Sequence, residues 1–172
     1  MKRISIRVIA LMPLAACAPA DTNTSQAPST EIEFSLARSG FIVPGEGTDG
    51  LVAFGALEGE TVLAATRALG TPSGRTSNAE CGAGPLDFVN YEEISLHFFD
   101  GEFAGWSLTP SSTLETRDGI GLGDSEGQLT ATYATQIVMD SLGREFDAEG
   151  FYGLIEAGEI SNMWAGISCV FR

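Results

Sequence analysis

The distribution of apolar and polar residues changes twice along the chain. A short apolar run covers residues 8–16, small and polar residues fill 18–30, and apolar and aromatic side chains recur from there to the end. A segment like 18–30 buries too little apolar surface to fold. We therefore expect a flexible tether at 17–31, followed by a single globular domain at 32–172, which is long enough for a core of its own.

Alternation of apolar and polar residues predicts strands in three places. Asp100-Gly101 is a typical hairpin turn between the first two strands, and Gly158 marks the turn of a second hairpin. The predicted strands are Glu93–Phe99, Phe103–Leu108, Phe151–Glu156 and Ile160–Phe171, and a further hairpin joins Phe34–Leu36 to Phe41–Val43. We expect one core face to carry Ile94, Leu96, Phe98, Trp106 and Trp164.

Two short segments have the helical period instead. Their apolar positions are Val62, Ala65 and Leu69 in the first, and Leu129 and Tyr133 in the second. Gly70 and the proline after it end the first helix. Ser125 and Gln128 have the spacing of a capping box at the start of the second.

The entries to the two helices resemble each other, which indicates an internal repeat. Gly50–Gly55 leads into Ala56–Glu60, and Gly119–Gly123 leads into Asp124–Gln128. Each helix precedes a predicted hairpin, so no strand–helix–strand alternation points to a parallel sheet. The predicted fold class is α+β: a largely antiparallel sheet with two short helices packed on one face, built from pseudo-duplicated helix-plus-hairpin units.

The first seventeen residues have the features of an export signal. Lys2, Arg3 and Arg7 precede the apolar run, which is too short to span a bilayer. Its end, Leu14-Ala15-Ala16-Cys17, resembles the bacterial lipobox. That resemblance implies cleavage of a signal peptide at residues 1–16 and acylation of Cys17, which anchors the protein to a membrane. By resemblance to enterobacterial lipoproteins, Ala18 implies the outer membrane, facing the periplasm.

Two further resemblances concern the domain. The blocks Glu80–Pro85 and Asp100–Trp106 resemble a group of proteobacterial secreted lipoproteins that has no established activity. The repeated helix-plus-sheet unit over residues 50–172 resembles the β-lactamase-inhibitor-protein-like and BamE/SmpA-like lipoprotein folds. Lipoproteins of those folds act through protein contacts, so the resemblance implies a protein partner.

The charge of the chain excludes some partners. Without the three basic residues of the signal, six arginines and no lysine remain against 23 acids, a net charge of −17. Such a surface repels nucleic acid, and it agrees either with a basic partner or bound cations, or with a solubility adaptation to a salty environment. No phosphate loop is present, and Gly119, Gly121 and Gly123 lack the spacing of a dinucleotide loop. We expect no nucleotide, no nucleic acid and no cofactor.

The remaining cysteines form an even pair. With Cys17 acylated, Cys81 and Cys169 are left in an oxidising compartment, and we expect a disulfide between them. The alternative is a catalytic thiol, for which His97, the only histidine, would have to act as the base. One histidine also argues against a zinc site, so we expect His97 to be structural or at the surface, and we expect no metal.

Carboxylates are the other candidate catalytic groups. Asp49, Asp100 and Asp118 each precede a glycine, a pattern that is foremost a turn signal. A pair of them could instead cleave glycosides or bind Ca²⁺. The interpretation we favour is a non-enzymatic cell-envelope lipoprotein without catalytic residues, whose domain binds another envelope protein. The alternatives are a periplasmic hydrolase using paired carboxylates, and a structural envelope component with no specific ligand.

Overall fold

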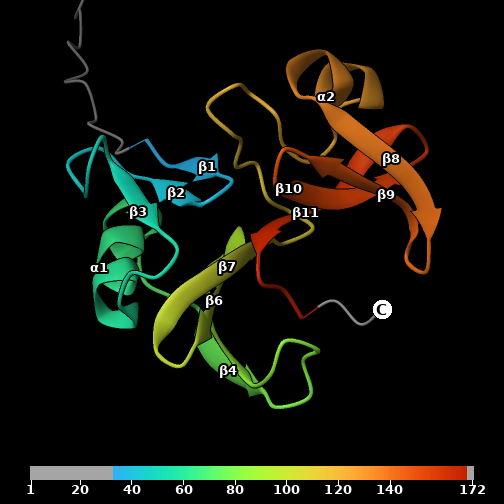
Figure 1. Ribbon diagram of the computed structural model, residues 1–172. Coiled ribbons are helices and arrows are strands. Elements are labelled where there is room, and N and C mark those ends of the chain that lie inside the picture. Colours follow the sequence, from blue (N-terminus) through green and yellow to red (C-terminus); the bar gives the residue numbers. More distant parts are fainter. Residues whose placement is uncertain (1–32, 170–172) are drawn as a thin grey trace, which may run out of the picture. The chain divides into compact units, whose positions relative to one another are not determined.

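The computed structural model describes residues 33–169 (Figure 1). The predicted signal peptide at 1–16, the lipid attachment at Cys17 and the tether at 17–31 lie outside the described residues. In the part of the chain that the structure describes, no helix is both long and apolar enough to cross a membrane.

Two helices and two antiparallel sheets make up the described chain, which confirms the predicted α+β class. The smaller sheet has the order β1-β2-β3, and the larger has the order β4-β5-β6-β7-β11-β10-β9-β8. The helices are α1 (Glu58–Leu69) and α2 (Glu126–Thr132). The strands are β1 (Ser35–Ala37), β2 (Gly40–Ile42), β3 (Leu51–Ala53), β4 (Gly74–Asn78), β5 (Leu86–Asn90), β6 (Ile94–Phe99), β7 (Glu102–Leu108), β8 (Thr135–Asp140), β9 (Gly143–Ala148), β10 (Phe151–Glu156) and β11 (Glu159–Gly166).

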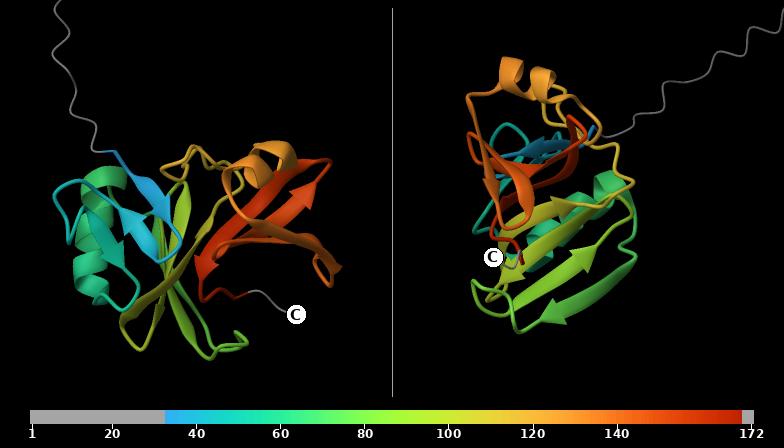
Figure 2. Two further views of the ribbon diagram at one scale, coloured as in Figure 1. Left: turned by 45° about the horizontal axis from the view of Figure 1, so that its top comes forward. Right: turned by 90° about the vertical axis from the view of Figure 1, so that its right-hand side faces the viewer.

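The large sheet and the two helices together form two similar halves. Each half is a helix followed by a four-stranded meander: α1 with β4–β7, and α2 with β8–β11. The last strands of the two meanders, β7 and β11, lie side by side and join the halves (Figure 2). Along this seam Ser107 pairs with Trp164 and Trp106 pairs with Ala165.

The backbone hydrogen bonds confirm the predicted duplication. The N–H of Glu58 donates to Gly101 O at 2.9 Å, and the N–H of Glu126 donates to Gly158 O at 2.9 Å. In both halves, therefore, the first turn of the helix is held by the turn of the second hairpin. Both hairpins also carry a register shift at the matching place, after His97 in one and after Leu154 in the other.

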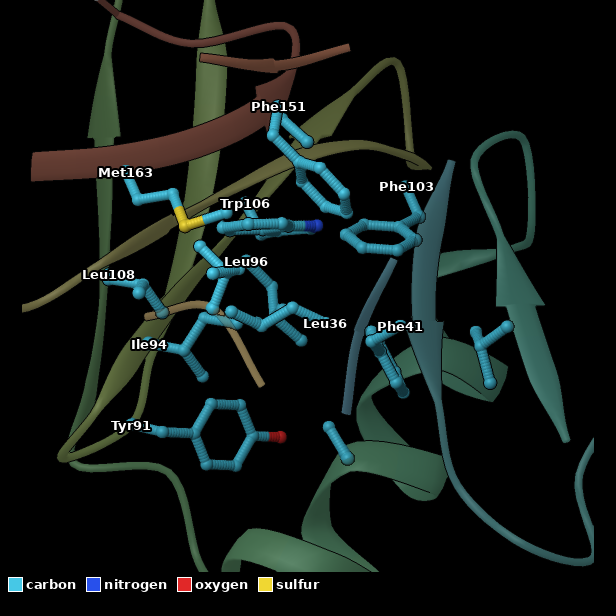
Figure 3. Close-up of a cluster of buried hydrophobic side chains, with 14 of the residues drawn as sticks. Leu36, Phe41, Tyr91, Ile94, Leu96, Phe103, Trp106, Leu108, Phe151 and Met163 are labelled. Carbon is cyan, nitrogen blue, oxygen red and sulfur yellow. The ribbon is translucent and has the colours of Figure 1, made fainter. Parts of the chain in front are cut away.

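One core lies between the large sheet, the small sheet and the helices (Figure 3). Figure 3 shows Trp106 surrounded by Leu96, Phe151 and Met163. The Trp106 side chain is fully buried, and its indole N–H points at the carbonyl oxygens of Gly40, at 2.8 Å, and Ala37, at 3.0 Å. Trp106 thus packs both halves together and ties the small sheet to them. Both helices contribute to the same core, through Ala64 and Ala65 of α1 and Leu129 of α2.

The helix boundaries follow the predicted signals. Helix α1 ends at Leu69, and the N–H of Gly70 donates to Thr66 O. Ser125 and Gln128 form the predicted capping box of α2. Leu129 and Tyr133 are both buried, as the helical spacing predicts.

Five strands were not predicted from the sequence: β3, β4, β5, β8 and β9. Strand β4 is an edge strand whose residues are almost all exposed, so it has no apolar face to alternate. Strand β8 shows the opposite pattern, because its three consecutive apolar residues, 137–139, hide the alternation. The last predicted strand, Ile160–Phe171, is also too long, since β11 ends at Gly166.

Trp164 does not share the core face with Trp106, so that part of the prediction was wrong. Neighbouring residues of a strand point to opposite faces, and Met163 and Ala165 are both in the core cluster. The two hairpins can be aligned at their turn glycines, Gly101 and Gly158. In this alignment Trp106 follows its glycine by five positions, whereas Trp164 follows its glycine by six. That single extra residue moves Trp164 to the other face of the sheet. Ile94, Leu96, Phe98 and Trp106 are on the predicted core face.

Candidate functional site

The face of the large sheet that points away from the core, the open face, carries a cleft of about 550 Å³. It lies over the seam between the two halves, where Trp164 pairs with Ser107. Apolar and aromatic side chains from both halves line it, among them Phe88, Leu154 and Trp164. Strands β5, β6 and β7 supply one side of this sheet-face cleft and strands β10 and β11 the other.

The segment after β11, residues 167–169, forms one wall of the cleft. The N–H of Ile167 donates to Ala104 O at 2.8 Å, and the Ile167 carbonyl faces His97 Nδ1 at 2.8 Å. Two residues later, Cys169 is joined to Cys81 in a disulfide with a Cα–Cα distance of 4.8 Å, within the range that this bond requires. The segment is therefore fixed over the open face at both of its ends.

A glycine in β7 makes room for this wall. A Cβ atom at Gly105 would lie 2.2 Å from Ile167 O and 2.8 Å from Ala165 O, distances that no real side chain tolerates. Because both contacts are backbone atoms, a larger residue would have to displace the segment itself. Gly105 is thus required by the close approach of two backbones rather than by an unusual dihedral angle.

His97 is the titratable group in the floor of the cleft, and it is 2% exposed. Its Nδ1 lies 2.8 Å from the Ile167 carbonyl, so this nitrogen carries the proton and donates it. The other ring nitrogen, Nε2, lies 2.9 Å from Ser107 Oγ and accepts its hydroxyl proton. The Phe88 ring closes a third side in a T-shaped contact, with ring centroids 5.0 Å apart. Burial lowers the pKa of His97, and the bond to Ile167 opposes this effect in part.

The contacts of His97 are those of a structural histidine. A serine–histidine pair occurs in acyl-transfer enzymes, where a carboxylate orients the histidine and stabilises its charged form. Here the orienting group is the neutral carbonyl of Ile167, and the ring is almost fully covered. The pair therefore connects the sheet to the C-terminal wall, and it has little access to a substrate.

The lowered pKa of His97 predicts that acid destabilises the fold. In the unfolded chain His97 has a pKa of about 6.5. Well above this pH the ring is neutral in both the folded and the unfolded state, and its full contribution to the free energy of unfolding is present. As the pH falls below 6.5, the unfolded chain binds a proton that the folded chain resists, so the free energy of unfolding decreases until the folded pKa is passed. Urea unfolding of wild type and His97→Gln between pH 5 and 8 measures this. A stability difference that does not change with pH would contradict the prediction.

A second cleft, of about 400 Å³, brings together two of the three turn carboxylates. Asp49 and Asp118 both line it, together with Arg38 and Arg117, whereas Asp100 lies elsewhere, at the β6–β7 turn. Both carboxylates are exposed, and acid–base catalysis needs one carboxylic acid kept protonated by burial or by neighbouring negative charge. The cationic lining of this second cleft works against such a role.

Tyr133 fixes one of these carboxylates. Its hydroxyl lies 2.9 Å from Asp118 Oδ2 and 2.7 Å from Thr116 Oγ1. The pKa of Tyr133 is raised, mainly by burial. The hydroxyl therefore stays protonated and can donate to the carboxylate. The contact explains the position of Asp118 as part of a loop anchored to the buried end of α2.

Cationic side chains of the described chain are engaged away from the open face. Arg75 pairs with Glu58 of α1, and Arg144 pairs with Glu126 of α2. The other two ion pairs are Arg38–Glu149 and Arg67–Glu46. None of these arginines lines the sheet-face cleft.

The sequence singled out His97 and the Cys81–Cys169 pair, but not as parts of one site. Ser107 and Leu154 were not singled out, and Trp164 was assigned to the core face. The spacing from the turn glycine could have identified Trp164, because its one extra position after Gly158 places it on the open face.

Among the described residues, no group of three or more histidine, cysteine or acidic side chains is arranged to hold a metal ion. Comparisons with protein-family models, curated proteins and solved structures give no match. The family resemblances drawn from the sequence therefore stay predictions.

Proposed function

We propose that this chain is a lipid-anchored protein of the bacterial outer membrane, and that its periplasmic domain binds another envelope protein without catalysing a reaction. The observation that carries the proposal is the sheet-face cleft, an apolar and aromatic recess built across the seam of the two halves. Aromatic residues such as Trp164 and Phe88 are enriched where proteins contact each other, and Leu154 adds apolar surface beside them.

The anchor is supported by the sequence alone. Basic residues, a short apolar run and the lipobox ending at Cys17 occur in the order that lipoprotein export requires. A tether rich in small and polar residues would then hold the domain at the membrane surface while leaving its faces accessible.

The lining of the cleft supports binding rather than catalysis. His97 has both ring nitrogens engaged and its ring covered, and the Cys169 sulfur is bonded to Cys81. An acyl-transfer or thiol mechanism needs one of these groups to reach a substrate. An apolar contact needs only the exposed parts of the aromatic and aliphatic side chains.

The anchor predicts a clear result for Cys17→Ala. Without the thiol no diacylglycerol can be attached, so labelled palmitate should not be incorporated and the uncleaved precursor should accumulate. Metabolic labelling followed by gel electrophoresis measures both effects. Cys81→Ser is the matched control, because it removes a cysteine and leaves the lipobox intact. Labelling that persists in Cys17→Ala would refute the anchor assignment.

The binding proposal predicts that one charge in the cleft abolishes partner capture. Leu154→Lys places an ammonium group in the apolar recess, where it would have to be desolvated by the partner. Crosslinking in intact envelopes, with the tagged full chain, should recover a defined partner with wild type and lose it with this variant. Leu63→Lys is the matched control, since Leu63 is 57% exposed on α1. A partner that is recovered equally with both variants would exclude the cleft.

A further inference from the structure

Strand β8 is one edge of the large sheet, and its outer side has no strand partner among the described residues. On an edge strand, alternate residues direct their N–H and C=O groups outward, where they can pair with another chain. Edge strands of soluble proteins are usually protected by charge, proline or a bulge. The pairing of β8 with β9 runs without a register shift from Thr135 to Asp140, and no proline interrupts it.

The two edges of the sheet differ in their side chains. Strand β4, at the other edge, has the polar sequence Gly-Arg-Thr-Ser-Asn, as expected of an edge that faces water. Strand β8 instead exposes two large apolar side chains: Val138 is 55% exposed and Met139 81% exposed. Met139 is the most exposed large apolar residue of the described chain. An apolar edge with unpaired backbone groups indicates a contact site for an extended segment.

The two faces beside β8 differ in chemistry. Cross-strand pairing runs from Trp164 through Tyr152 and Asp147 to Gln136, so these four residues are on the open face. Val138 and Asp140 share that face with Gln136, and with Asp147 and Tyr152 they line a recess of about 170 Å³. On the opposite face, β8 presents Ile137, packed against the core, and Met139.

We propose that the outer edge of β8 accepts an extended segment of the envelope partner as a ninth strand. In this segment, basic side chains on the open face alternate with apolar side chains on the opposite face, which carries the core. The basic side chains would lie near Asp140 and Asp147, which are both exposed, and one could enter the recess between them. The apolar side chains would cover Met139 and the outer part of Ile137. This proposal rests on the proposed function, because it assigns the chemistry of the partner's contact. A second copy fits less well, since two chains that each carry 23 acidic residues against nine basic ones repel each other.

The test uses the full chain in phosphatidylcholine nanodiscs, which carry no net charge. The probe is a fluorescein-labelled peptide of about ten residues that alternates lysine and valine. We expect saturable binding by fluorescence anisotropy, weakening as salt is raised past about 0.15 M. Hydrogen exchange measured by mass spectrometry should show new protection in β8. A peptide that alternates glutamate and valine should bind at least about tenfold more weakly.

The matched variants place two lysines on each edge. Val138→Lys with Met139→Lys should weaken the lysine–valine peptide by about tenfold or more, because it protects the edge with like charge. Thr76→Lys with Ser77→Lys adds the same charge to β4 and should weaken it by no more than about twofold. Both variants should fold, because all four side chains are exposed, and circular dichroism checks this.

The proposal would be overturned by equal loss in the two double variants, by equal binding of the two peptides, by no binding, or by protection outside β8. Dimerisation through β8 without peptide would replace it with self-pairing. Loss of partner capture in Leu154→Lys is independent of all of these. The proposed binding function therefore survives failure of the edge, and fails only if the capture experiment fails.

Discussion

Replacing Trp106 by alanine is expected to lower the free energy of unfolding by about 3–5 kcal/mol. The side chain is fully buried at the seam, where it contacts both halves of the large sheet, so its removal leaves a cavity that the surrounding rings cannot fill. The variant also leaves the Ala37 and Gly40 carbonyls without their indole donor. Urea unfolding followed by circular dichroism measures the loss.

Two matched variants separate the causes. Trp106→Phe retains most of the apolar contact but not the N–H, and it should cost about 0.5–1.5 kcal/mol through the lost hydrogen bond to the Gly40 and Ala37 carbonyls. Trp164→Ala removes the same side chain from the open face, outside the core cluster, and should cost less than Trp106→Ala. If Trp164→Ala is the more destabilising of the two alanine variants, the assignment of the two tryptophans to opposite faces is wrong.

Removing the disulfide is expected to destabilise the domain by a similar amount. The bond closes a loop with a sequence separation of 88 residues. In the chain-entropy model such a constraint on the unfolded state contributes about 4–5 kcal/mol, which should be lost when both Cys81 and Cys169 are replaced by serine. Thermal and urea unfolding of the double variant measures it.

Chemical reduction provides the control for the serine substitutions. Wild type treated with a reducing agent should match the double variant in stability, and thiol titration should detect the two cysteines only after reduction. A wild-type protein whose two thiols react without reductant would show that the pair is not oxidised in solution. A double variant as stable as wild type would show that the loop is already constrained by its other contacts.

Local signals in the sequence were enough for the helices and for the strands at the centre of the sheet. The capping box at Ser125 and the glycine after Leu69 set helix ends through contacts within a few residues. Ile94, Leu96 and Phe98 alternate with more polar residues because β6 has the core on one face only. These features depend on the chain's immediate neighbours, so they can be recognised in one sequence.

The cleft could not be predicted in the same way, because it depends on pairing between distant strands. His97 was predicted to be either structural or at the surface, because its partner Ile167 is 70 positions away and is brought there only by the seam. The role of Gly105 is visible only once the backbone of residues 165–167 is seen to pass over it. The edge strands were missed for a related reason, since β4 and β8 each have a strand on one side only.

The seam between β7 and β11 has a consequence for the kinetics of folding. Every other neighbouring pair in the large sheet joins consecutive strands, so each meander consists of contacts that close short loops. Local contacts form quickly, whereas pairing between distant strands must first overcome a larger loop-closure entropy. We therefore expect the pairing of β7 with β11 to be the slow step of folding. Substitutions at the seam would change the folding rate, while those at the outer strands would mainly change the unfolding rate.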